Sequence, residues 1–150
     1  MAEAGPLTDP LAGAPAWARA LLRDARVARL GTADRGGRPH VVPVCYALDN
    51  FRIWSAVDDK PKRTTRLRRL ANIVDNPLIT LLVDEWSEEW SRLRWVRVDG
   101  RGEIVEGADA ERGIALLRDK YPQYRAMGLG DRTTPLIRIT VGRLVSWAAV

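Results

Sequence analysis

Six segments with the spacing and composition of β-strands fill most of the chain after residue 25. Turn residues bound them: glycine, asparagine, aspartate or proline. The segments cover residues 26–32, 40–48, 51–57, 78–84, 94–106 and 135–150. The sequence has no repeated strand–helix–strand unit and no G-x-G-x-x-G loop of a dinucleotide-binding fold. The pattern therefore predicts a mainly β protein with short helices, built as a six-stranded barrel.

Helical spacing occurs in three stretches between the strands. They are residues 15–24, the stretch from the turn at 58–59 to Asn76, and residues 108–121. In the second stretch, Leu67 and Leu70 recur at helical spacing with either Ile73 or Val74. Residues 123–134 show no such spacing and are predicted to form a mobile loop.

Several residues interrupt the regular pairing of the strands. The first three segments are joined by short turns, so they are predicted to form a meander. Pro43 removes a main-chain donor from the middle segment, which places that position at an edge, a bulge or a site where the sheet faces something else. Gly100 and Gly102 predict a bulge or a sharp bend in the fifth segment.

Cys45 is the only cysteine and His40 the only histidine. An internal disulfide and a Cys/His zinc cluster within one chain are therefore excluded. The sequence also gives little support for the catalytic triad of a hydrolase, because no serine lies in a G-x-S-x-G motif. If the protein is an enzyme, we expect a bound cofactor to carry the chemistry.

The 150 residues match the size of one domain. Residues 1–14 are rich in alanine, glycine and proline and predict a flexible N-terminal tail, which leaves residues 15–150 as the folded domain. No apolar run reaches the roughly 18 residues that cross a bilayer, and the first residues lack the pattern of a secretory signal. We expect a cytoplasmic protein.

The positive charge of the chain is concentrated in one short segment. The formal net charge is +5, and six of the ten residues from 60 to 69 are basic: Lys60, Lys62, Arg63, Arg66, Arg68 and Arg69. The first three lie at the predicted start of a helix, where the helix dipole disfavours cations. A phosphate held by Lys62, Arg63, the Thr64 hydroxyl and free helix amides would resolve this conflict.

A solvated helix face is the alternative interpretation of the same charges, and it stays open. Arg66, Arg68 and Arg69 are assigned to such a face, because they lie beyond the first helical turn. Nucleic-acid binding is disfavoured, since the segment has neither interleaved aromatic residues nor a helix-turn-helix.

Three segments resemble the split β-barrel proteins related to pyridoxamine phosphate oxidase, specifically the F420-dependent group of actinobacteria. They read ARVARLGTADRGGRPHVVPVCYAL, IWSAVDDKPKRTTRLRRLANIVDNPLITLLVD and WVRVDGRGEIVE, and they cover nearly the whole chain after the tail. The resemblance implies the fold of the FMN-binding split barrel. It also implies a homodimer with cofactor pockets at the subunit interface.

The resemblance assigns cofactor contacts to residues of this chain. The tricyclic ring would lie against the second strand, at Val42, Pro43, Val44 and Cys45. The phosphate would be held by Ser55, Ala56, Lys60, Lys62, Arg63 and Thr64. The turn DDKPKRTT is longer than the common pattern, which leaves open whether Lys62 or Arg63 makes the main contact. The partner subunit would complete the pocket with Trp95 and Trp147, unless these are core or interface residues.

Other residues near the implied site have less definite roles. Trp86 and Trp90 lie four apart in an acidic segment and predict an exposed patch or a lid over the pocket. His40 is a proton donor or a structural histidine. The thiol of Cys45 is predicted to be buried and inert.

The activity implied by the resemblance is hydride transfer from reduced F420 to a conjugated small-molecule acceptor. No side chain is predicted to be a chemical catalyst. The alternatives are an FMN-binding oxidase-like flavoprotein and a non-enzymatic protein that binds a cofactor or a tetrapyrrole.

Overall fold

The protein is described by a computed structural model that covers residues 9–57, 63–131 and 134–149, with residues 63–67 as backbone only. One antiparallel sheet contains all strands of this part of the chain, in the order β2-β1-β5-β6-β7-β4-β3. The strands are β1 (Ala28–Ala33), β2 (Pro39–Val44), β3 (Ala47–Asp49), β4 (Arg52–Ala56), β5 (Leu78–Glu85), β6 (Arg94–Val105) and β7 (Leu136–Ala148). The mainly β architecture predicted from the sequence is confirmed.

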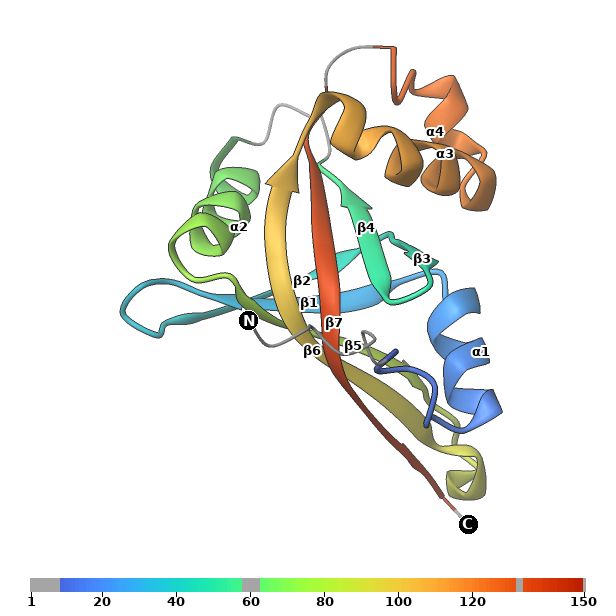
Figure 1. Cartoon of the computed structure of the whole chain (residues 1–150). Coiled ribbons are helices and arrows are strands. Elements are labelled where there is room, and N and C mark those ends of the chain that lie inside the picture. The colour runs from blue at the N-terminus through green and yellow to red at the C-terminus, as the bar shows by residue number, and fades with distance from the viewer. Residues whose placement is uncertain (1–8, 58–62, 132–133, 150) are drawn as a thin grey trace, which may run out of the picture.

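The sheet curls because two consecutive strands form its opposite edges. β2 and β3 are separated only by Cys45 and Tyr46, yet they lie at the two ends of the strand order. So short a link keeps the two edges close together, and the sheet becomes an open barrel (Figure 1). We call residues 45 and 46 the corner.

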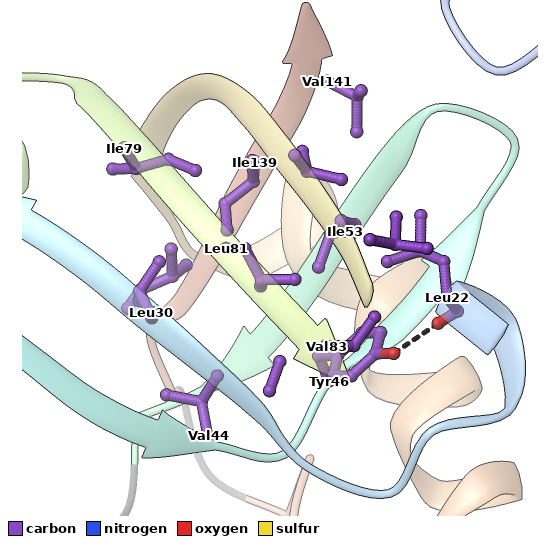
Figure 2. Close-up of a cluster of buried hydrophobic side chains, with 14 of the residues drawn as sticks. Leu22, Leu30, Val44, Tyr46, Ile53, Ile79, Leu81, Val83, Ile139 and Val141 are labelled. Carbon is purple, nitrogen blue, oxygen red and sulfur yellow. Dashed lines mark hydrogen bonds between the residues drawn. The ribbon is translucent and has the colours of Figure 1, made fainter. Parts of the chain in front are cut away.

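Two predictions made from the sequence are wrong at the corner. Residues 40–48 were predicted as one strand of a six-stranded barrel, but the described part of the chain has seven strands. The first three predicted segments do not form a meander either, because β2 pairs with β1 whereas β3 pairs with β4. The physical reason is the ring of Tyr46, which is fully buried in the core, so the chain bends inward here; its hydroxyl donates to the Leu22 carbonyl (Figure 2).

A long ribbon of β6 and β7 forms the middle of the sheet. The register of this pair shifts between Asp99 and Gly100, which confirms the predicted bulge. A Cβ atom on Gly100 would overlap the carbonyl oxygen of Thr140, so the close approach of the two strands requires glycine.

Helices cover parts of the curled sheet. They are α1 (Ala16–Asp24), α2 (Arg63–Asp75), α3 (Glu111–Lys120) and α4 (Gln123–Ala126), with 3₁₀ turns at Trp90–Arg92 and Gly107–Ala110. In α2, Ile73 is the residue that enters the core, whereas Val74 is 72% exposed. The predicted helix 108–121 begins as a 3₁₀ turn, and α4 lies where only a loop was predicted. In Figure 1, α3 and α4 lie together at one end of the molecule.

The main core fills the inside of the curl. In β5, the side chains of Ile79, Leu81 and Val83 are buried, whereas the alternate residues Leu78 and Leu82 face outward. Figure 2 shows these inward side chains meeting those of β1, β4 and β7. Leu11 of the predicted tail is also buried here, in a turn over residues 10–13, while residues 1–8 lie outside the described part. Within that part, no helix is long and apolar enough to cross a membrane.

Candidate functional site

A cavity of about 470 Å³ opens where the free edge of β2 approaches β4. It is built from β2, the corner, β4, α2 and the junction of α3 with α4. Its lining residues are Pro43, Val44, Cys45, Ser55, Ala56, Arg69, Tyr121, Gln123, Tyr124 and Met127. The size lies within the range of small-molecule sites, and the wall combines apolar, aromatic and cationic side chains.

The edge position of β2 confirms the interpretation of Pro43. β2 is hydrogen-bonded to β1 on one side only, so a residue without an amide hydrogen costs no ladder bond on the other side. Pro43 and Val44 both line the cavity, and the side chain of Val44 is also part of the main core (Figure 2). The neighbouring Val42 does not line it and packs against the main core instead.

Two side-chain hydroxyls hold the main chain of the corner. Ser55 Oγ donates to the carbonyl oxygen of Cys45 at 2.8 Å. The amide of Tyr46 donates to Tyr121 Oη at 3.2 Å. Ser55 is 1% exposed, and its hydroxyl hydrogen is already used inside the protein. To donate to a phosphate, as predicted from the sequence, it would have to release Cys45.

The thiol of Cys45 is exposed, so the prediction that it is buried was wrong. The side chain turns into the cavity because its neighbours Val44 and Tyr46 take the buried positions on either side. The sole cysteine of the chain therefore provides a specific chemical probe of this cavity.

Lys120 lies behind the corner as a desolvated cation. Its Nζ is 4.0 Å from the centre of the Tyr46 ring. Burial, and then the nearby guanidinium of Arg26, lower the pKa of Lys120 to about 8. Burial also raises the pKa of Tyr121, which keeps its hydroxyl protonated near neutral pH.

Arg69 is the cationic side chain that the structure places on the cavity. Assigning it to the solvated face was wrong, although Arg68 beside it is exposed as expected. The sequence carried a signal for this: Arg69 lies next to Leu70 and four residues before Ile73, on the flank of the apolar stripe of α2. A cation in that position is half-covered by the fold instead of free in solvent.

The remaining residues of the predicted phosphate site cannot be placed. Lys60 and Lys62 lie outside the described residues, and for Arg63 and Thr64 only the helical backbone is described. Arg63 is the first residue of α2, so the basic segment does lead into a helix. Whether Lys62 or Arg63 contacts a phosphate stays a prediction.

The tryptophans named from the sequence lie away from this cavity. Trp95 of β6 pairs across the ribbon with Trp147 of β7, and neither lines the cavity. Trp86 and Trp90 are 68% and 69% exposed and do not line it either. They belong to the β5–β6 connection, at the end of the molecule opposite α3 and α4 (Figure 1). The structure supports an exposed patch there, and within the described residues of one chain the two tryptophans do not cover the cavity. His40 of β2 is partly buried and also lies off the cavity.

Four lining residues come from the α3–α4 junction and were missed in the sequence. They are Tyr121, Gln123, Tyr124 and Met127. The rings of the two tyrosines meet edge to face, with centroids 5.7 Å apart. The spacing of two tyrosines across Pro122 was the available signal, but the segment after Pro122 was interpreted as a loop without a readable motif.

An antiparallel sheet curled into an open barrel, with a cavity at its split edge, defines a split-barrel protein. The sequence matches the family model of pyridoxamine 5'-phosphate oxidase over residues 15–147, and the chain belongs to this family. The resemblance found in the sequence is thereby confirmed at the level of the family.

Solved structures share the fold at low identity. A conserved hypothetical protein from Mycobacterium tuberculosis is 23% identical, with a TM-score of 0.64 over 87% of this chain and 81% of that one. A FAD-binding protein from Mesorhizobium loti is 20% identical, with a TM-score of 0.65 over 85% and 87%. HutZ, the haem storage protein from Vibrio cholerae, is 16% identical, with a TM-score of 0.64 over 82% and 85%. A comparison with curated proteins finds no match.

Proposed function

We propose that this protein is an oxidoreductase that binds the deazaflavin cofactor F420 in the cavity between β2 and β4. The observation that carries the proposal is the composition of that cavity, with an apolar strand edge on one side and Arg69 on another. Membership in an oxidase family and a FAD-binding relative of the same fold support a flavin-type ligand.

The described residues fit such a ligand. Pro43 and Met127 offer apolar surface to a flat ring, and Tyr124 adds an aromatic one. Arg69 offers a cation to a phosphate or a carboxylate. F420 carries a phosphate and a tail of glutamates, so it needs more positive charge than FMN. The basic segment 60–69 and the net charge of +5 favour F420 on this ground.

Bound F420 would supply hydride transfer to a conjugated acceptor. The protein would bind and orient the cofactor and exclude water from the site. The β2 edge would orient the ring, since Pro43 and Val44 are fixed by pairing with β1. Arg69 would hold the anionic end. We assign no side chain as a chemical catalyst.

FMN in the same cavity is the alternative within the family. A tetrapyrrole store is a further alternative, prompted by the fold shared with HutZ. Among the described residues, the sole histidine His40 lies off the cavity, so an iron bound there would need Cys45, Met127 or a tyrosine as its ligand. This makes haem storage less well supported than flavin binding. A cytoplasmic location stays a prediction.

The test is a fluorescence titration of the purified protein with F420 and, separately, with FMN. We expect micromolar or tighter binding of F420, weakened at least tenfold by Lys62→Ala or Arg63→Ala. Because Cys45 is the sole cysteine and lies in the cavity, bound F420 should also slow its alkylation by iodoacetamide at least tenfold. Binding of FMN without F420 would move the assignment to the oxidase branch. Binding of neither would overturn the cofactor proposal.

We also propose that the protein is a homodimer that uses the outer face of the sheet. The strand register places Val41, Leu82 and Trp147 on this face, and they are 64%, 36% and 47% exposed. The ion pair of Arg97 with Asp99 lies between them, at 3.2 Å. Exposed apolar side chains gathered on one face are typical of an interface between copies, and the Arg97–Asp99 pair keeps its two charges matched when that face is covered.

Leu82→Glu is therefore expected to raise the dissociation constant of the dimer at least tenfold, because it places a charge without a partner in the interface. Light scattering over a dilution series measures this. Val74→Glu is the matched control, since Val74 is an exposed valine on α2, outside this face. A wild-type protein that is monomeric at 100-fold the working concentration would contradict the proposal.

A further inference from the structure

The corner is both a wall of the cavity and the two-residue connection between the strands that form the two edges of the sheet. Its position therefore decides how far β2 stands from β4, which is the width of the cavity. Cys45 projects from the corner into the cavity, and Tyr46 anchors it in the core. A group that fixes the main chain here controls the shape of the site.

The hydroxyl of Tyr121 is such a group. It accepts the amide hydrogen of Tyr46 at 3.2 Å. Its own hydrogen lies between two carbonyl oxygens, those of Arg26 at 2.9 Å and Tyr46 at 3.1 Å. One oxygen atom thus joins the α1–β1 connection, the corner and the end of α3, which are up to 95 residues apart in sequence.

The ring of Tyr121 is fixed as firmly as its hydroxyl. The side chain is 6% exposed, with the guanidinium of Arg26 4.6 Å from the ring centre on one side. The Tyr124 ring packs edge-on against it, and both rings line the cavity. A rotation of Tyr121 would therefore move the corner and the α4 wall together.

We propose that Tyr121 is a positioning residue that, through the main chain of Tyr46 and its own interaction with the Cys45 side chain, sets the place of Cys45 and the closure of the cavity around its ligand. The part that concerns the ligand rests on the proposed function. The part that concerns the corner does not. Ser55 acts from the other side of the corner, through its bond to the carbonyl of Cys45.

Tyr121→Phe tests this, because it removes the hydroxyl and keeps the ring. The first measurement is the alkylation rate of Cys45 at several pH values, compared at the high-pH limit where a change of thiol pKa no longer matters. We expect this limiting rate to rise at least fivefold. The second measurement is the F420 dissociation constant at 10 °C, well below thermal unfolding, where we expect a rise of at least fivefold.

Tyr46→Phe is the matched control. It also removes a buried tyrosine hydroxyl bonded to a carbonyl oxygen, that of Leu22, but it leaves the main-chain bonds of the corner intact. A purely structural role of Tyr121 predicts the same result for both variants. We expect Tyr46→Phe to leave the limiting rate of Cys45 within twofold of the wild type, because the buried ring that anchors the corner is kept.

The outcomes separate the inference from the proposed function. An unchanged Cys45 rate in Tyr121→Phe, or an equal change in Tyr46→Phe, overturns the inference. A faster rate with unchanged F420 affinity also overturns it, because the corner would then not shape the binding site. If the wild-type protein binds no F420 or FMN, the proposed function fails, and the Cys45 rates alone decide the role of Tyr121.

Discussion

Gly113→Ala is expected to lower the free energy of unfolding by about 2 kcal/mol, since overlap with a buried indole puts the overpacking cost at about 3 kcal/mol and alanine returns about 1 kcal/mol of helix propensity. Gly113 is buried in α3 against the indole of Trp54. An added Cβ would lie 2.6 Å from Trp54 Cδ2 and 2.8 Å from Leu136 Cδ1. Urea unfolding measures the change.

The sign of the effect makes this prediction decisive. In an exposed helix, a change from glycine to alanine stabilises. Here we expect the opposite, because the indole ring is 2% exposed and has no free space to move into. Ala115→Gly, at an exposed position of the same helix, is the control and should cost about 1 kcal/mol by propensity alone. A stabilised Gly113→Ala protein would show that α3 does not pack against β4 as described.

Arg69→Glu is expected to weaken F420 binding about 100-fold, since a charge-assisted hydrogen bond contributes about 1.5–3 kcal/mol and each 1.4 kcal/mol is tenfold in affinity. Arg69 lines the cavity from α2. Reversal of its charge replaces an attraction for the anionic end of the ligand with a repulsion. The fluorescence titration used for the wild type measures the loss.

Arg68→Glu is the matched control for this substitution. It makes the same change of net charge one residue away, on the exposed side of the same helix. We expect it to change the affinity less than threefold at physiological salt, because an exposed charge is screened over about 8 Å. Equal losses in the two variants would mean that only the overall charge of the protein matters, and that the ligand does not contact Arg69.

The sequence predicted the elements of this fold better than their connections. Strand and helix segments were read from local spacing, and Pro43 and Gly100 marked an edge and a bulge correctly. The division of residues 40–48 at the corner was not visible, because it depends on partners distant in sequence. The hydroxyl of Tyr121, which holds the corner, lies 75 residues beyond Tyr46.

The candidate site was predictable on its strand side and less so on its helical side. Pro43, Val44, Cys45, Ser55 and Ala56, which the resemblance assigned as cofactor contacts, all line the cavity, and their contact with a cofactor stays a prediction. Arg69 could have been assigned to the site from helical spacing, because it lies next to Leu70 on the flank of the apolar stripe of α2. The positions of Tyr121 and Tyr124 on the cavity depend on how α3 packs on β4. That packing follows from the contact between Gly113 and Trp54, which are distant in sequence, and no local sequence pattern indicates it.

The strand order also bears on how the chain is made. β7 is the last strand in the sequence, yet it lies inside the sheet between β6 and β4. Until residues 136–148 have left the ribosome, the β3–β4 hairpin has no ladder to join, and its edge stays open to other chains. The sheet can therefore be completed only once β7 has been made, in one step that joins both halves together.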